Sequence, residues 1–530
     1  MRSKNLICNK RKSIICLFVI LTSINLNAQE GGQLNIEELT IQEMQNLMQA
    51  GQVTSEQLVK TYLQRIKELD GKLNAIIELN PEALQVARAM DKERENGKVR
   101  SLMHGIPFVI KDNIETADKM HTTAGSFALL EMNKPKKDAF IISQLRASGA
   151  ILLAKTNLSE WANFRSTNSS SGWSGRGGQT HNPYILDRSP CGSSSGSGVA
   201  VSANLTAVAI GTETDGSIVC PASLNGIVGI KPTLGLLSRS GIIPLAHSQD
   251  TADPMARTVT DAAIMLQEMV ARDRNDLISL TKNKTINFEI DYTKSLVKNG
   301  LKGMKIGVAK QYFGESQAIA EVMNKSLATM KANGAILIDV ELPEYKNYGD
   351  AEYEVLLYEF KSDLNIYLAD RGGKYDSLEK LIQFNRDNSD KQMPYFKQEI
   401  FEEAQLKTEL DKKSYLKALS KSKEVTRRKG IDVIMDKHNL DAIVAPSNMP
   451  AWTIDLIYGD SPNNYISSSS LAAVSGYPNI TVPAGFIKKM PIGISFFGRA
   501  YSESTLIKIA YAWEQVSKAR KKPEMLETYH

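Results

Sequence analysis

A serine-rich run is the first segment of this 530-residue chain whose residue types could do chemistry. Residues 191–198 read CGSSSGSG, which suits a flexible linker, a phosphate-binding turn or a hydrolase site. The run fits Gly-x-Ser-x-Gly, the turn that presents the nucleophile of α/β-hydrolases, with Ser194 as that nucleophile. The motif needs a strand directly before it and a histidine late in the chain. Two prolines precede it here, and only His438 and His530 lie well downstream, so we interpret the match as a chance one.

The histidines of the chain show no spacing typical of metal ligands. They are His104, His121, His181, His247, His438 and His530. We therefore expect each of them to be a surface or core residue, and we expect neither a metal site nor a cofactor.

A serine hydrolase without a histidine base can use a lysine, provided that burial holds the amine neutral near pH 7. Lys111 fits this role because it ends the apolar segment GIPFVIKDN, where three large apolar residues run directly into the ammonium. Considered alone, the same segment favours a strand-end lysine paired with Asp112.

The segment GTETDGSIVCPAS, at residues 211–223, supplies a second component. It follows an apolar run and is punctuated by glycine, so successive backbone N–H groups can converge on one point beside Ser217. Main-chain N–H groups form oxyanion holes in this way. An ordinary strand-to-loop turn explains the glycines but not their combination with the lysine and the serine run.

These segments together resemble the amidase signature family. The serine-rich run 190–204, the G-T-E-T-D-G-S-I turn after it and the G-I-P-x-x-I-K-D strand before it match the family's defining segments in order. The likeness covers nearly all of residues 35–520. The resemblance implies a single α/β domain in which a large, mixed, mostly parallel sheet is sandwiched between helices.

The resemblance also implies a role for each matching residue. It makes Ser217 the acylated nucleophile, Ser193 a bridging serine with a cis peptide bond, and Lys111 the base at the end of the proton relay. The family forms its oxyanion hole from the backbone N–H groups of four residues, which here are Thr214, Asp215, Gly216 and Ser217.

The chain departs from the commonest family pattern at Cys191, Ser195, Asp215 and Val219. In these departures the segments SPCGSSSGSG, TETDGSIVCPAS and AKTNLSEWANFRS are similar to bacterial peptide amidases. We therefore expect hydrolysis of C-terminal or small primary amides to carboxylate and ammonia through an acyl-enzyme. The alternatives are an α/β-hydrolase esterase that uses Ser194 and a non-catalytic binding protein that kept the fold.

The elements that must position these residues are visible as apolar, β-branched runs, which are typical of strands covered on both faces. The runs are PFVIKDN (107–113), ILLAKTN (151–157), LTAVAIGTET (205–214), MKIGVAK (304–310), GAILIDVEL (334–342), LDAIVAP (440–446) and NITVPAG (479–485). Helical patterns lie between several of them, which favours an α/β sandwich around a largely parallel sheet. Capping-box patterns at Thr40 and Thr54, with Asn80-Pro81, predict three helices within residues 40–95.

The N-terminus has the pattern of a secretory signal: a cationic segment, a short apolar stretch and a small residue at Ala28. We expect a signal peptide over residues 1–28, a linker over 29–39 and the amidase signature domain over 40–522. Within that domain, residues 344–430 predict a helical insertion that is either solvated or a lid. The protein is then periplasmic or secreted.

Removal of the signal peptide would change the charge balance. The chain carries 64 Lys and Arg against 59 Asp and Glu, and five basic residues lie within residues 1–28, which leaves 59 of each. A net charge of zero gives no reason to expect nucleic acid or an anionic membrane as a partner. We expect a small-molecule or peptide amide substrate, and the same features disfavour a role in tRNA amidotransfer.

Cys191 and Cys220 are the two cysteines that would remain after removal of the signal peptide. An oxidising compartment would permit one bridge between them. We nevertheless expect two small, buried residues near a packed site, which are either reduced or dispensable for folding.

Overall fold

The computed structural model describes residues 34–276, 278 and 288–529. The predicted signal peptide and the first part of the predicted linker lie outside the described residues. Residues Ile36–His530 belong to one compact unit. Among the described residues, no helix has both the length and the apolar composition that a membrane crossing requires.

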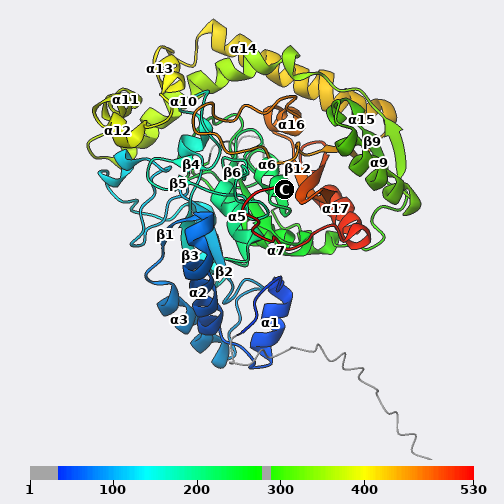
Figure 1. The fold of residues 1–530 in the computed structure, drawn as a ribbon, viewed down its shortest axis with the longest axis horizontal. Coiled ribbons are helices and arrows are strands. Elements are labelled where there is room, and N and C mark those ends of the chain that lie inside the picture. Colours follow the sequence, from blue (N-terminus) through cyan, green and yellow to red (C-terminus); the bar gives the residue numbers. More distant parts are fainter. Residues whose placement is uncertain (1–33, 277, 279–287, 530) are drawn as a thin grey trace, which may run out of the picture. The chain divides into compact units, whose positions relative to one another are not determined.

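A mixed sheet forms the centre of this unit (Figure 1). Its order is β1-β3-β2-β6-β8-β7-β12-β13-β11-β9-β10. The strands are β1 (Ile76–Leu79), β2 (Pro107–Lys111), β3 (Ile151–Thr156), β6 (Val208–Glu213), β7 (Val228–Lys231), β8 (Thr251–Ala256), β9 (Lys305–Val308), β10 (Ile336–Asp339), β11 (Ala442–Pro446), β12 (Asn479–Ile487) and β13 (Met490–Phe497). A separate pair consists of β4 (Trp173–Ser174) and β5 (Gly178–Gln179).

The predicted α/β fold with a large mixed sheet is confirmed, but the expectation that most strand pairs are parallel is wrong. Four pairings are parallel, β3–β2, β2–β6, β11–β9 and β9–β10, and they join only predicted strands. Six are antiparallel, and each of them involves β1, β7, β8 or β13. The sequence did not predict these four strands. They are short or contain proline, as at Pro254 and Pro491, and lack a long β-branched run.

Helices flank the sheet. They are α1 (Ile41–Gln49), α2 (Ser55–Leu73), α3 (Ala83–Glu95), α4 (Phe140–Ala147), α5 (Ser195–Ser202), α6 (Val219–Leu224), α7 (Val259–Met269), α9 (Gln317–Ala332), α10 (Gly349–Arg371), α11 (Leu378–Asp387), α12 (Ser389–Gln392), α13 (Glu399–Gln405), α14 (Lys413–Thr426), α15 (Asp432–His438), α16 (Ser469–Ser475) and α17 (Glu503–Ser517). The three helices predicted within residues 40–95 are present as α1, α2 and α3. Both predicted capping boxes form, with Thr40 paired to Glu43 and Thr54 paired to Gln57.

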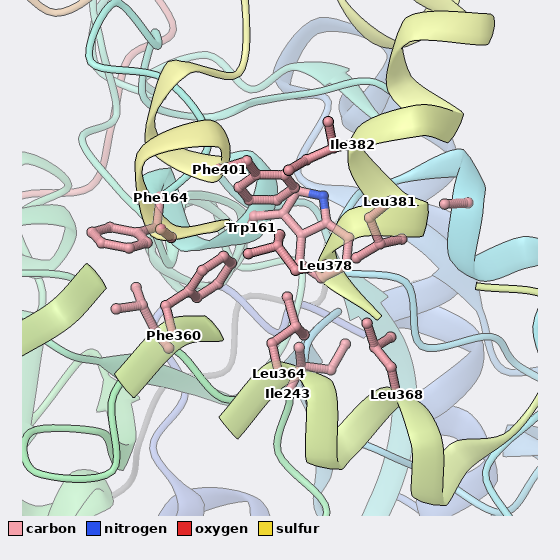
Figure 2. Packing of buried hydrophobic residues seen from close by; sticks show 14 of the residues in the cluster. Trp161, Phe164, Ile243, Phe360, Leu364, Leu368, Leu378, Leu381, Ile382 and Phe401 are labelled. Carbon is pink, nitrogen blue, oxygen red and sulfur yellow. The ribbon is translucent and has the colours of Figure 1, made fainter. Parts of the chain in front are cut away.

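Residues 344–430 contain α10 to α14, and α10 lies alongside α14. Figure 2 shows how aromatic and aliphatic side chains of this region pack against the rest of the unit. Trp161 contacts Phe401 with ring centroids 5.7 Å apart, and Phe164 contacts Phe360 at 5.1 Å. The segment is therefore docked through a buried apolar cluster. Whether it acts as a lid stays a prediction.

Candidate active site

The carboxyl ends of β2 and β6 place a lysine beside a threonine. The two strands are parallel neighbours with Ile110 opposite Ile210, and both are buried along their whole length. Parallel strands end at the same edge of a sheet, so the residues that follow this pair come together there. Lys111 and Thr212 therefore meet in the interior, where the lysine side chain is fully buried.

The start of α5 lies directly over β6 because Gly211 has no side chain. A Cβ atom at Gly211 would lie 2.6 Å from Ser194 Oγ and 2.5 Å from Ile218 Cδ1. The close approach brings the serine-rich run next to the end of β6. The peptide bond between Gly192 and Ser193 is cis in this run, as the resemblance predicts.

A hydrogen-bonded chain connects the lysine to both serines of the prediction. Lys111 Nζ lies 2.7 Å from Ser193 Oγ, and Ser193 Oγ lies 3.0 Å from Ser217 Oγ. The backbone N–H of Ser194 donates to the carbonyl of Ser217 at 3.2 Å, which holds the two segments together. The structure thus brings Lys111, Ser193 and Ser217 into one continuous line.

Three oxygens accept from Lys111 Nζ, namely Ser193 Oγ at 2.7 Å and the Thr212 carbonyl and hydroxyl at 3.2 and 2.9 Å. A neutral amine has two N–H donors and one lone pair, so in that form the Thr212 oxygens can keep the two donors while the lone pair faces the hydroxyl of Ser193. Burial lowers the pKa of Lys111 to about 7, although the negative charges of Asp253, Asp250 and Glu213 oppose this change.

The turn between β6 and α6 presents main-chain donors beside Ser217. Gly216 has a φ of +75°, and none of the N–H groups of residues 214–217 donates to an acceptor among the described residues. The next two N–H groups, those of Ile218 and Val219, both donate to the buried carboxylate of Glu213. This capping fixes the turn, so the four predicted oxyanion-hole donors remain available to a ligand.

Ser217 opens into a cavity of about 670 Å³. The cavity walls include Gly192, Asp215, Trp452, Asp460 and Ser469. Among the described residues that line it there is no histidine, lysine or arginine. The nucleophile therefore faces a cavity that is lined mostly by polar residues and is large enough for a small acyl group.

The alternative nucleophile, Ser194, does not lie in this cavity. Its hydroxyl is fully buried and donates to the carbonyl of Thr212 at 3.0 Å, while the N–H of Thr212 donates back to Ser194 Oγ at 3.2 Å. No described histidine lies close enough to hydrogen-bond with Ser194. The geometry thus contradicts the esterase alternative and gives Ser194 the local hydrogen-bonding role.

The expectation that Cys191 and Cys220 are reduced is wrong. The two residues form a disulfide with Cα atoms 5.9 Å apart, and both line the cavity. The bridge is possible because the serine-rich run and α6 meet at the relay, a proximity that the sequence separation of 29 residues does not reveal. It joins the segment of Ser193 to the segment of Ser217.

Several residues around the relay were not predicted as site residues. Asn113 donates to the Thr212 hydroxyl at 3.0 Å, and Thr212 itself holds the lysine. Both lie inside the motifs that drew attention to their neighbours, so their positions at strand ends were a usable signal. Ser469 and Glu352 come from remote segments without a motif, and no sequence signal pointed to them.

Helix α10 is also attached to the loop that follows β7. His247 Nδ1 lies 2.8 Å from the Asp363 carboxylate, and His247 Nε2 lies 3.3 Å from Glu359. Burial opposes protonation of this imidazole, but the hydrogen bond to Asp363 and the charge of Glu359 outweigh it and raise its pKa. Each of the two ring nitrogens faces a different carboxylate, which is the arrangement expected of an imidazolium that donates from both nitrogens.

Comparisons with known proteins agree with this geometry. The profile of the family described as Amidase matches residues 57–507. The chain is 39% identical over 502 residues to a probable amidase of Arabidopsis thaliana, covering 93% of this chain and 92% of that protein. It is 34% identical to a glutamyl-tRNA(Gln) amidotransferase subunit of Thermoanaerobacter pseudethanolicus, covering 93% of this chain and 99% of that one.

Solved structures are similar over the same extent. The native peptide amidase of Stenotrophomonas maltophilia is 46% identical, with a TM-score of 0.87, and 92% of this chain and 99% of that chain are covered. A structure of the peptide amidase with the competitive inhibitor chymostatin gives the same identity and coverage and a TM-score of 0.89. An amidase family protein of Bacillus anthracis is 38% identical, with a TM-score of 0.84 and coverage of 92% and 93%.

Proposed function

The chain belongs to the amidase family, and we propose that it hydrolyses primary amides at peptide C-termini and on small molecules to carboxylate and ammonia. The observation that carries the proposal is the chain of contacts from buried Lys111 through Ser193 to Ser217, which opens into the cavity. A pKa of about 7 makes Lys111 a base at neutral pH.

In the proposed acylation step, neutral Lys111 takes the proton of Ser193 while Ser193 takes the proton of Ser217. The Ser217 oxygen forms a bond to the carbonyl carbon of the amide, and the N–H groups of residues 214–217 receive the developing negative charge on the carbonyl oxygen. The protonated relay then returns a proton to the amide nitrogen. The carbon–nitrogen bond breaks, and ammonia leaves from an acyl-enzyme.

Deacylation uses the same groups in the same order. A water molecule loses a proton to the relay as its oxygen bonds to the acyl carbon, and the tetrahedral intermediate again places its charge at the turn. When the bond to Ser217 breaks, Ser193 returns a proton to Ser217. The products are a carboxylic acid and the free enzyme, and the relay ends in its starting protonation state.

A peptide acyl group is favoured by the polar walls of the cavity. The main chain of a peptide needs partners for its N–H and C=O groups when it is buried. Asn163 and Ser171, from the polar stretch 163–179, line the cavity and hydrogen-bond to each other at 3.1 Å. The 46% identity to a peptide amidase supports the same choice.

Export from the cytoplasm is a further part of the proposal. The signal-like N-terminus motivates it, and the disulfide between Cys191 and Cys220 is typical of an oxidising compartment. Expression of the full chain in a bacterial host with a secretory system tests it. N-terminal sequencing of the exported protein should begin at Gln29, whereas an intact N-terminus in the cytoplasmic fraction would contradict export.

The substrate proposal is tested with a peptide amide, an aryl-acetamide and free glutamine, each followed by mass spectrometry. We expect conversion of the peptide amide to the peptide acid with its internal bonds intact. Ser217→Ala protein serves as the control for uncatalysed hydrolysis. If only the aryl-acetamide reacts, or if an internal peptide bond is cut first, the peptide amidase proposal fails and membership of the family is unaffected.

A further inference from the structure

The described charged side chains that line the cavity beside Ser217 are all acidic. Asp215 and Asp460 line it, and the described lining residues provide no basic side chain. Both carboxylate oxygens of Asp460 already accept hydrogen bonds from the protein, one from the backbone N–H of Ser171 at 3.0 Å and one from the indole N–H of Trp452 at 2.8 Å. Asp215 is the acidic group next to the nucleophile itself.

Asp215 is held between two partners. Ser469 donates to its Oδ1 at 2.7 Å from the start of α16. Glu352 approaches from α10, and this carboxyl group is 2% exposed. Gln249 donates to Glu352 Oε1 at 2.9 Å, and the hydroxyl of Tyr345 also approaches this carboxyl group, whose Oε2 has no hydrogen-bond partner of normal geometry among the described residues.

Two adjacent buried carboxyl groups cannot both be ionised at low cost, so the pair shares one proton. Burial and the neighbouring charge of Asp215 raise the pKa of Glu352 well above its ordinary value. Burial also raises the pKa of Asp215, but the hydroxyls of Ser470 and Ser469 and the hydrogen bond from Glu352 oppose this and favour its ionised form. The shared proton therefore resides on Glu352, which donates it to Asp215. The single negative charge of the pair resides on Asp215.

The buried cation in this region does not face the cavity. Lys231 Nζ donates to the carbonyls of Pro232 and Tyr477 at 3.1 and 2.8 Å, and Lys231 is not among the residues that line the cavity. Glu213 is committed to the N–H groups of Ile218 and Val219. An acyl group in the cavity thus meets the carboxylates of Asp215 and Asp460 without a compensating base, and Asp215 is the one in the turn of Ser217.

We propose that Asp215 is a specificity-determining residue, which makes the cavity accept neutral and cationic acyl groups and reject those with a carboxylate near the scissile amide. This inference rests on the proposed amide hydrolysis. A substrate carboxylate would lose its hydration without gaining a basic partner and would be repelled by Asp215. Glu352 is a positioning residue, because it acts on the substrate only through the proton it shares with Asp215.

The test uses three N-acetylated dipeptide amides that differ only in the last residue: lysine, leucine or glutamate. We expect kcat/KM for the lysine amide to exceed that for the glutamate amide by about tenfold or more, mainly through KM. Equal values for the two charged substrates would overturn the inference. Failure to hydrolyse any of the three would instead refute the proposed function on which it rests.

Variants assign the preference to its source. Asp215→Asn should bring the lysine-to-glutamate ratio towards one, whereas Glu352→Gln should keep it, because an amide also donates to Asp215. Ser461→Arg places a base on an exposed part of the cavity wall and should raise kcat/KM for the glutamate amide. Asp339→Asn, a surface acid paired with Lys310, is the matched control with an unchanged ratio. If Asp215→Asn leaves the ratio of kcat/KM for the lysine and glutamate amides unchanged, Asp215 does not set specificity.

Discussion

The protonation state of Lys111 should control the rate of hydrolysis. At pH 7 a lysine with the ordinary pKa of 10.5 is neutral in about one molecule in 3,000, whereas a pKa of about 7 makes about half of the molecules neutral. Burial therefore raises the concentration of the active base by about a thousandfold at this pH. The effect corresponds to about 5 kcal/mol of differential solvation of the two protonation states.

The measurement is kcat/KM for a peptide amide between pH 5 and pH 10, followed by ammonia release. Because kcat/KM reports the free enzyme, we expect a slope of one on the acid side, a midpoint near pH 7 and a plateau above it. Lys111→Arg keeps a cation of similar length that cannot become neutral. It should lower kcat/KM by about three orders of magnitude, with no recovery at high pH.

Lys155 provides the matched control. It is also buried, burial lowers its pKa to about 8, and it lies opposite Ile110 on the neighbouring strand. Its amine donates to the Ile114 carbonyl and the Thr122 hydroxyl and does not contact Ser193. Lys155→Arg should lower stability but leave the midpoint of the pH profile in place. A wild-type midpoint near pH 10, or an active Lys111→Arg enzyme, would refute the assignment of Lys111 as base.

Three further predictions concern the serines, the disulfide and the imidazole. Ser217→Ala should lower kcat by about a thousandfold or more, and mass spectrometry with a slow substrate should then detect no acyl-enzyme. Ser193→Ala should also lower kcat severely, but by less than Ser217→Ala. Near-wild-type turnover of Ser217→Ala would exclude Ser217 as the nucleophile. Reduction should add the mass of two hydrogens to the intact protein, and replacing Cys191 and Cys220 by Ser should cost about 3–4 kcal/mol in urea unfolding, as expected for closing a loop of this separation. The raised pKa of His247 adds stability below its unfolded pKa that disappears as the pH rises through the folded pKa. His247→Gln should therefore lower the free energy of unfolding by about 1 kcal/mol or less at pH 6, a small value because the side chain is 37% exposed. The loss at pH 9 should be smaller still, and an equal loss at both pH values would contradict the charged contact.

The parts of the fold that sequence could predict are those with a repeated local signal. Buried parallel strands carry continuous apolar runs, so β2, β3, β6, β9 and β11 were identifiable. Between the two parallel blocks only β12 was predicted, whereas β8, β7 and β13 were missed because they are short or contain proline and carry no long β-branched run. The error in strand direction follows from the omission of these three strands and of the edge strand β1.

The site residues that sequence could predict are likewise those that stand in a local motif. Lys111, Ser193 and Ser217 each stand in a contiguous motif, and strand pairing brings those motifs together. Glu352 lies on a charged helix whose sequence resembles any solvated surface, and its contact with Asp215 depends on how α10 docks. Local pattern identifies groups on one segment, whereas a carboxyl pair formed by two distant segments requires the tertiary structure.

The contacts of helix α10 with the site affect how chimeric enzymes could be built. Its segment is a natural unit for recombination between relatives, because it lies between β10 and β11 as one run of helices. The run nevertheless places Glu352 against Asp215 in the nucleophile's turn, and Glu359 and Asp363 against His247. A graft of this segment therefore replaces the carboxyl group that donates to Asp215 and both carboxylates that hold His247. The charge preference should survive exchange of residues 344–430 where the incoming helix carries an acid or amide at the position of Glu352, and the exchange replaces no residue of the Lys111 relay.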